Sequence, residues 1–436
     1  MIILIYSTYN AQNVRQNLGK SEYSYYFVLR EFRPVLEELG VVVEVRDPIQ
    51  EVDTIYRNCV AQGVACVFLP FMPPNKVPIG LNCPTVPVFA WEYETIPNEG
   101  FSDKPRNDWR RVLTLLGSAI THSSYTEKVV KASLGQQFPI ISAPSPLWER
   151  LFALFDPSAE PFLREVVVRV DGMVIDSRTT DLTPYSKAAE RAISPVPLPL
   201  PPERQEGMVE LTLSGVVYTS IFNPGDGRKN WKNMIGAFCT AFADVEDATL
   251  LLKLSHHDIR ELLPQMLVCM HKAGDFLCRV VLVNGYLQED EYQRMVDATS
   301  YAVNTSHGEG QCLPLMEYMS CGKPAIAPRH TAMLDYIDES CAFVIDSSSV
   351  IGTWPHDMRQ AFRTLRKRIH FGSLIDTYRA SYHVAKNEPE TYKNMARSAV
   401  ESLRRYCSRE EIKPRLNHFI WDVVSRDPNQ ANHSAS

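Results

Sequence analysis

The sequence lacks an excess of positive charge, long apolar runs and paired cysteines. Its 436 residues carry a formal net charge of −6, which argues against bulk nucleic-acid binding because that function usually needs a basic face. No segment approaches the roughly 18 consecutive apolar residues of a membrane-spanning helix. The opening MIILIYSTYN has the length of a strand and no basic segment before it, so no signal peptide is predicted. Ten cysteines occur without a CxxC pair, which predicts reduced thiols in a cytoplasmic protein and no zinc site.

Several motifs of enzyme sites are also missing. There is no HExxH zinc signature, no nucleophile elbow and no D-x-D metal motif. Gly19, Lys20 and Ser21 look like the end of a P-loop. A P-loop needs another glycine five residues upstream, and Val14 stands there, so that interpretation fails.

Length and composition fit a soluble protein of two domains. Hydrophobic residues make up 45% of the chain and charged residues 22%, as in ordinary globular proteins, and the length suits two domains of about 200 residues. Short apolar runs alternate with helical patterns, which predicts an α/β fold with two doubly wound parallel sheets. The strands predicted for the first sheet are Ile2–Tyr6, Val41–Val45, Cys66–Leu69, Val86–Ala90 and Ala119–Thr121. Those predicted for the second are Val216–Phe222, Thr249–Leu254, Arg279–Val283, Tyr301–Asn304, Ala325–Ala327 and Phe343–Ile345.

The domain boundaries are predicted from this alternation. The predicted segments are a first domain over 1–205, a second over 206–385, helices over 386–427 and a disordered tail over 428–436.

An irregular zone over 144–207 lies between the two domains. Its alternating stretch Val166–Ile175, with Asp171-Gly172 near the centre, predicts a β-hairpin. The Pro-rich SPVPLPLPP that follows predicts a stiff spacer at a hinge in preference to an SH3-type ligand.

The most informative stretch is SHGEGQCLPLMEYMSCGKPAIAP, from Ser306 to Pro328. It places Glu309 and Glu317 on either side of a helix start, and Gly308 and Gly310 give a loop that can take positive φ. Pro314 suits the first turn of a helix, where its missing N–H costs nothing. Because a strand precedes the loop and another follows the helix, the free N–H groups of the helix start form an anion site, most naturally for phosphate.

The frame E-G-x-x-L-P-x-x-E-x-M-x-x-G-x-P in this stretch resembles that of the family 4 retaining glycosyltransferases, which have the GT-B fold. The resemblance implies that Glu309 lies beside the donor sugar, that Glu317 holds the ribose, and that the turn at Gly308–Gly310 receives the diphosphate. It also places Gln311, Cys312 and Leu313 in the donor site. The alternative is a Rossmann-like turn whose glutamates only cap and solvate a helix.

A second motif, IFNPGDGRKNWKNMIGAF, runs from Ile221 to Phe238. A helix with an apolar stripe is predicted from about Asn230, so Arg228 and Lys229 fall at the carboxyl edge of the second sheet, where ligands of open α/β sheets bind. Two cations there can stabilise a leaving diphosphate without a metal. The family carries an Arg and then a Lys about six residues later. Lys229 matches that Lys, but Asn223 stands in place of the Arg, and Arg228 is the candidate substitute.

The first domain offers fewer candidates. The resemblance places a Gly-containing loop after the first strand, facing the cleft between the lobes, so Gly19 and Lys20 are candidates for contact with donor phosphate or acceptor. Many members carry a sugar-contacting His at the end of the fourth strand, where this chain has Trp91 and Glu92. Trp91 is equally compatible with a buried structural role, and His122 is as compatible with packing or capping as with ligand contact.

Three weaker signals remain. Asn284, Gly285 and Leu287 align in order with the strand whose end holds the nucleotide base in the family. His330 and Thr331 fall where the family has a Gly-Gly loop near the diphosphate. A basic segment predicted to be helical could rest on anionic lipid, although a solvated helix face is the default; its cations are Arg363, Arg366, Lys367 and Arg368.

The resemblance implies a metal-independent, retaining transfer of a sugar, hexosyltransferase-like, from a nucleotide diphosphate-sugar to a hydroxyl acceptor, with no cofactor. It also implies C-terminal helices that cross back to the first lobe. The expected acceptor is a saccharide or lipid-linked saccharide of bacterial cell-surface polysaccharide or lipopolysaccharide synthesis, with peripheral contact at the inner face of the membrane. Two alternatives stay open: a nucleotide-sugar epimerase or hydrolase on the same fold, and a catalytically silent nucleotide-sugar-binding subunit.

Overall fold

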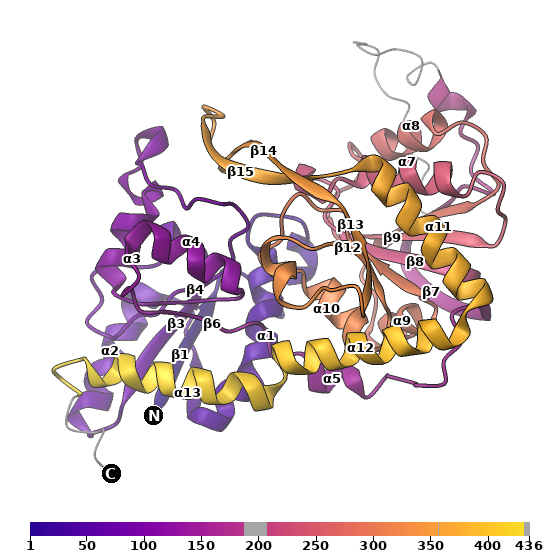
Figure 1. Ribbon diagram of the computed structural model, residues 1–436. Coiled ribbons are helices and arrows are strands. Elements are labelled where there is room, and N and C mark those ends of the chain that lie inside the picture. Colours follow the sequence, from indigo (N-terminus) through magenta and orange to yellow (C-terminus); the bar gives the residue numbers. More distant parts are fainter. Residues whose placement is uncertain (187–206, 356, 431–436) are drawn as a thin grey trace.

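The computed structural model describes residues 1–186, 207–355 and 357–430, so the predicted Pro-rich spacer lies outside the described residues. The chain forms two α/β lobes that stand side by side (Figure 1). Each lobe has its own parallel sheet covered by helices, as the alternation of strands and helices predicted.

The first lobe is built on a six-stranded sheet in the order β2-β1-β3-β4-β5-β6, and every pairing in it is parallel. The five predicted strands are present, and β6 was not predicted. The strands are β1 (Ile2–Ser7), β2 (Val41–Glu44), β3 (Cys66–Phe71), β4 (Val88–Phe89), β5 (Ala119–Thr121) and β6 (Ile140–Ser142). The helices are α1 (Tyr23–Leu39), α2 (Pro48–Ala61), α3 (Trp109–Leu116) and α4 (Ser124–Leu134). The short helix α5 (Trp148–Phe152) follows β6 and packs on the second lobe, where Leu151 is buried with Leu315 and Met319.

The main sheet of the second lobe contains all six predicted strands and one more. Strand β8 pairs in parallel with β9 on one side and with β11 on the other, so the order of strands reverses at β8. The parallel strands are β8 (Met208–Phe222), β9 (Ala248–Leu254), β10 (Arg279–Gly285), β11 (Tyr301–Val303), β12 (Ala325–Pro328) and β13 (Ala342–Ile345). The helices between them are α7 (Trp231–Ala241), α8 (Leu263–Lys272), α9 (Glu289–Asp297) and α10 (Leu313–Ser320).

The hairpin predicted around Asp171-Gly172 is wrong. Residues Leu163–Asp176 form one continuous strand, β7, which pairs antiparallel with the first half of β8 and with β10. This segment therefore belongs to the second sheet, although it was assigned to the linker of the first domain. Gly172 is required for close approach and makes no turn, since a Cβ there would lie 2.2 Å from the carbonyl oxygen of Asn284.

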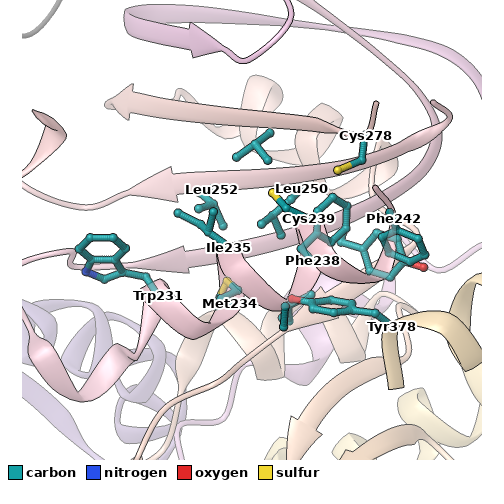
Figure 2. Close-up of a cluster of buried hydrophobic side chains, with 14 of the residues drawn as sticks. Trp231, Met234, Ile235, Phe238, Cys239, Phe242, Leu250, Leu252, Cys278 and Tyr378 are labelled. Atoms are coloured by element: carbon teal, nitrogen blue, oxygen red, sulfur yellow. The ribbon is translucent and has the colours of Figure 1, made fainter. Parts of the chain in front are cut away.

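The apolar stripe of α7 anchors the core of the second lobe. Trp231, Met234, Ile235 and Phe238 are all at most 5% exposed and pack toward β9 and the Tyr378 ring (Figure 2). The i, i+3, i+4, i+7 spacing of these residues puts them on one helix face, which holds the start of α7 firmly at the carboxyl edge of the sheet.

The basic segment predicted to be helical is a strand. The segment belongs to strand β15 (Phe362–Ile369), which forms an antiparallel hairpin with β14 (Ser347–Thr353). The hairpin reaches across to the first lobe (Figure 1), where Trp354 Nε1 donates to Thr95 Oγ1 at 3.0 Å. Arg359 and Arg363 both form ion pairs with Glu99 of the first lobe. The hairpin therefore links the two lobes.

Three helices end the chain: α11 (Phe371–Asn387), α12 (Pro389–Cys407) and α13 (Arg409–Ser425). In Figure 1 the yellow α12 and α13 run along both lobes, and Leu416 and Ile420 of α13 are buried in the core of the first lobe.

The predicted disordered tail is wrong for residues 428–430, because Gln430 is buried and accepts a hydrogen bond from the Cys66 amide at 2.6 Å. Within the described residues, no helix has both the length and the apolar character needed to cross a membrane.

Candidate functional site

A cleft of about 1390 Å³ lies between the two lobes. It is larger than the roughly 300–1,000 Å³ of a common small-molecule pocket. Its second-lobe wall is formed where β8 and β11 end, the point at which the strand order reverses. Ligands of open α/β sheets bind at such a point because the two adjacent loops diverge there.

The loop after β8 is shaped by its own polar residues. The Asp226 carboxylate accepts from the Arg228 amide at 3.2 Å and caps the 3-10 turn η6 (Gly227–Lys229). Asn230 then takes the left-handed conformation with φ 56°, which asparagine tolerates well. Thr305 Oγ1 donates to the Lys229 carbonyl at 3.1 Å and so ties this loop to the one after β11.

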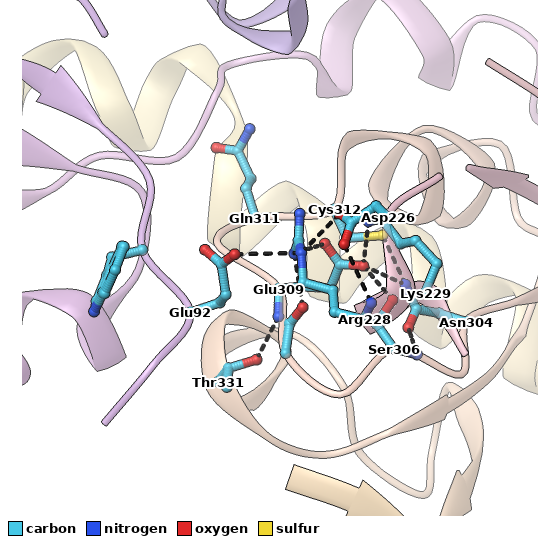
Figure 3. Close-up of polar contacts among 12 residues, drawn as sticks. Glu92, Asp226, Arg228, Lys229, Asn304, Ser306, Glu309, Gln311, Cys312 and Thr331 are labelled. Carbon is cyan, nitrogen blue, oxygen red and sulfur yellow. Dashed lines mark hydrogen bonds and ion pairs between the residues drawn. The ribbon is translucent and has the colours of Figure 1, made fainter. Parts of the chain in front are cut away.

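Glu309 is the centre of the resulting cluster (Figure 3). It is 3% exposed, and its Oε1 accepts from Lys229 Nζ at 2.6 Å. Its Oε2 accepts from Arg228 Nη1 at 3.2 Å. Oε1 has two more donors, Ser306 Oγ at 2.5 Å and Asn304 Nδ2 at 3.1 Å. Burial alone would raise the pKa of Glu309, but the two cations and these hydrogen bonds lower it to about 2. Glu309 is therefore a carboxylate at neutral pH.

Arg228 forms ion pairs with three carboxylates in the cleft. Its Nε lies 2.9 Å from Asp226 Oδ2 and 3.2 Å from Glu92 Oε1 of the first lobe. Burial opposes its charge, but Glu92, Asp226 and Glu309 together raise the pKa of its guanidinium well above the usual value. For Lys229 burial also lowers the ammonium pKa, and Glu309 outweighs this and raises it.

The loop at Gly308–Gly310 differs from its predicted conformation. Neither Gly308 nor Gly310 has positive φ; the left-handed residue is Cys312, with φ 67°. Both glycines permit close approach of the first lobe, because a Cβ at Gly310 would lie 2.6 Å from Ala90 Cβ and one at Gly308 would lie 2.9 Å from the Glu92 carbonyl oxygen.

Glu317 lies in the cleft but is already hydrogen-bonded. Its Oε1 accepts from Arg150 Nη2 at 3.1 Å, and its Oε2 accepts from the Tyr292 hydroxyl. Burial raises the pKa of Glu317, although Arg150 and Tyr292 oppose that shift. Arg150 also bonds to the buried Glu31 of α1, at 3.0 Å, so this network also joins the two lobes.

Most of the predicted site residues that follow Glu309 contact other parts of the protein. Gln311 Oε1 accepts from the Ser145 amide at 2.7 Å, and the Asn304 amide group donates to Cys312 Sγ at 3.0 Å. Leu313 begins α10 and lines the cleft. Thr331 Oγ1 accepts from the Glu309 amide at 3.0 Å, so it helps to shape the loop. The neighbouring His330 is buried, which lowers its pKa to about 4.

The residues predicted for the nucleotide base fall at the end of β10. Gly285 and Leu287 line the cleft, whereas Asn284 holds two segments together by donating to the His256 carbonyl at 3.0 Å and to the Leu254 carbonyl at 3.2 Å. Asn223, at the position of the expected Arg, donates to the Gly19 carbonyl at 2.9 Å.

In the first lobe, Gly19 and Lys20 line the cleft, and Lys20 Nζ donates to Asn17 Oδ1 at 2.8 Å. Trp91 is 4% exposed and packs against Trp109, with ring centroids 4.5 Å apart and the rings tilted, which favours a packing role. His122 is fully buried; its Nδ1 bonds to the Ala143 carbonyl at 3.1 Å, and burial lowers its pKa to about 4.

Sequence reasoning missed several residues of the cleft. Asp226 carried a signal, because an Asp before Gly-Arg suits a cap. No sequence signal pointed to Arg150, which lies in the predicted linker, or to Lys253, which lies in an apolar strand. The described residues hold no group of three or more His, Cys, Asp or Glu side chains placed to share a metal ion.

Solved structures of low sequence identity share this architecture. The sucrose-phosphate synthase of Thermosynechococcus elongatus is 11% identical, with a TM-score of 0.56, over 98% of this chain and 99% of that one. HepE of Anabaena, solved with UDP and glucose, is 11% identical, with a TM-score of 0.52, over 97% of this chain and 100% of that one. A glycosyltransferase of Rickettsia africae is 9% identical, with a TM-score of 0.51, over 98% of this chain and 99% of that one.

Neither a protein-family model nor a curated protein sequence matches the chain. At these identities the structural likeness concerns the fold, and it spans both lobes. The chain therefore has the GT-B fold, as predicted.

Proposed function

We propose that this protein is a retaining, metal-independent glycosyltransferase that moves a sugar from a nucleotide diphosphate-sugar to a hydroxyl acceptor. The observation that carries the proposal is the cluster of Lys229, Arg228 and Glu309 at the reversal of strand order, facing a cleft between two GT-B lobes. The proteins compared above include HepE, whose structure holds UDP and glucose.

Lys229 and Arg228 would stabilise the negative charge on the leaving diphosphate. Lys229 has three N–H donors, and the contact with Glu309 uses one of them. The others can bind a diphosphate oxygen, so that the ammonium and the guanidinium of Arg228 stabilise the charge that develops as the bond to the sugar breaks. The charge of Glu309 then lies where positive charge builds up on the sugar, and Glu317 holds the ribose.

Retention follows from attack on the face that the leaving group occupies. The acceptor hydroxyl would bond to the anomeric carbon as the diphosphate departs, and a diphosphate oxygen would take the hydroxyl proton. The buried Glu309 lies among cations that lower its pKa, which makes it a poor base and favours this role for the phosphate.

The acceptor would enter from the side of the β14–β15 hairpin. Ile351 and Phe362 of this hairpin are 62% and 74% exposed, and Arg366 and Arg368 nearby are also exposed. Apolar side chains flanked by cations suit an anionic lipid surface. The proposed acceptor is accordingly a saccharide or lipid-linked saccharide, presented at the inner face of a membrane in cell-surface polysaccharide synthesis.

A binding screen and a product assay test the proposal. Thermal unfolding with UDP, GDP, CDP, ADP and dTDP identifies the nucleotide, because a ligand that binds only the native state raises Tm. With the matching nucleotide-sugar and an acceptor, the anomeric configuration of the product reports retention, and activity in a chelator reports metal independence.

Two variants test the residue roles. Glu309→Ala should abolish transfer, and undiminished transfer would refute its assignment. Glu317→Ala should weaken nucleotide binding, and unchanged affinity would refute the ribose role.

Loss of the nucleotide-sugar without any acceptor would support the epimerase or hydrolase alternative. Nucleotide binding with no turnover would support the silent subunit.

A further inference from the structure

Lys253 is a buried lysine at the edge of the cleft that has no role in the mechanism above. It is the sixth residue of the seven-residue strand β9, 7% exposed, and it lines the cleft. Its neighbours across the sheet are apolar, Ile221 on β8 and Val283 on β10. Lysine is seldom buried unless it is paired with an acid.

No acid balances this lysine within the described part of the chain. None of the ion pairs found there includes Lys253, and its Nζ has a single hydrogen bond, a long one of 3.3 Å to the Leu254 carbonyl. Burial lowers the pKa of the ammonium to about 8. A buried ammonium with unused donors is costly, and the cost is offset if a ligand supplies the acceptors.

The placement of Lys253 indicates which kind of ligand would supply these acceptors. Its register partner Ile221 lies two residues before Asn223, where the cation of the expected Arg is missing. Asn223 is turned to Gly19 and carries no charge. Arg228 and Lys229 are held by three carboxylates, from Glu92, Asp226 and Glu309. Among the described cations of the second-lobe wall of the cleft, Lys253 is therefore the one whose charge no described acid offsets.

We propose that Lys253 binds the diphosphate of the donor nucleotide and supplies the positive charge that Asn223 lacks. This inference rests on the proposed function, since it assumes a nucleoside diphosphate in the cleft. Its consequence is that nucleotide affinity depends on a residue outside the loops that carry the recognised motifs.

Paired titrations of a nucleoside diphosphate and its nucleoside test the proposal. The full-length protein is titrated with UDP, GDP, CDP, ADP and dTDP and with the nucleoside of each. Lys253→Met should weaken binding of the preferred diphosphate by about tenfold or more, because hydrogen bonds to charged groups are among the stronger ones. Binding of the nucleoside should be unchanged, and Lys253→Arg should recover part of the lost affinity.

Lys323→Met is the matched control, because Lys323 is also buried, at 8% exposure, and does not line the cleft. It should leave diphosphate affinity unchanged. Without ligand, Lys253→Met should be at least as stable as the wild type, since it removes an unbalanced buried charge. If this variant does not fold, Lys253→Gln allows the same comparison.

The outcomes separate this inference from the proposed function. Diphosphate binding within twofold of wild type in the Lys253 variants overturns the inference alone. Equal loss of nucleoside and diphosphate also overturns it, since the contact would then be to the nucleoside. If the wild type binds none of the five diphosphates, the proposed function fails and this inference fails with it.

Discussion

The Nε atom of Arg228 in the second lobe lies 3.2 Å from Oε1 of Glu92 in the first lobe (Figure 3). The same guanidinium binds Glu309, the carboxylate at the centre of the candidate site. One side chain thus links the contact between lobes to the charge balance of the cleft. Any ligand that competes for Arg228 must therefore also alter the interface between the lobes.

Replacing Glu92 should change both the stability of the contact between the lobes and the affinity for a nucleoside diphosphate. In Glu92→Gln the guanidinium loses one of its carboxylates, so we expect the free energy of unfolding to fall by about 1–3 kcal/mol. Nucleoside diphosphate should bind more tightly, because Arg228 is then easier to recruit. Denaturant unfolding and calorimetric titration measure the two effects. Glu94→Gln, at an exposed position nearby, is the control, and equal behaviour of the two variants would contradict the coupling.

The low pKa of Glu309 predicts a specific pH dependence of stability. Its folded-state pKa, about 2, is below the usual 4.5, so the ionised group stabilises the fold above pH 4.5 and this contribution is lost as the pH falls toward 2. Glu309→Gln should cost roughly 2–4 kcal/mol at pH 7. The difference from wild type should shrink between pH 5 and 3. A difference that stays constant over this range would contradict the prediction.

The close approach of the lobes at Gly310 can be tested with one added methyl group. Gly310→Ala places a Cβ 2.6 Å from Ala90 Cβ, so the lobes must shift, and we expect a loss of about 1–3 kcal/mol in unfolding free energy. Gly372→Ala is the control, because its Cβ meets nothing within 4 Å. It should be neutral or slightly stabilising. Equal stability of the two variants would show that the gap at Gly310 can relax.

The exposed apolar and cationic side chains of the β14–β15 hairpin predict that the protein binds anionic vesicles. The double change Ile351→Ser and Phe362→Ser should reduce co-flotation with phosphatidylserine-containing vesicles severalfold, because each exposed apolar side chain that enters the lipid contributes to binding. Binding to purely zwitterionic vesicles should be weak for both proteins. Leu115→Ser removes an apolar side chain that is 61% exposed on α3 and should change nothing. A wild type that does not float with anionic vesicles would refute membrane contact.

Local sequence determined much of this molecule. The apolar runs predicted eleven strands of the two parallel sheets, and the glycine, proline and apolar spacing from Ser306 to Pro328 predicted the loop and the helix start beside Glu309. These features depend on periodicity and on backbone preferences within a few residues, so a sequence displays them directly.

Tertiary structure decided what those elements meet. Arg150 and Glu317 are 167 positions apart in sequence, and only the packing of α5 against α10 brings them together. The basic run Phe362–Ile369 has cations at helical spacing, yet it is a strand because Ser347–Thr353 pairs with it. The glycines at 308 and 310 suggested positive φ but serve close approach to the first lobe. Lys253 looked like one polar residue in an apolar strand. Its solitary charge is a property of the folded protein, because it depends on which acids the other segments place, or do not place, around it.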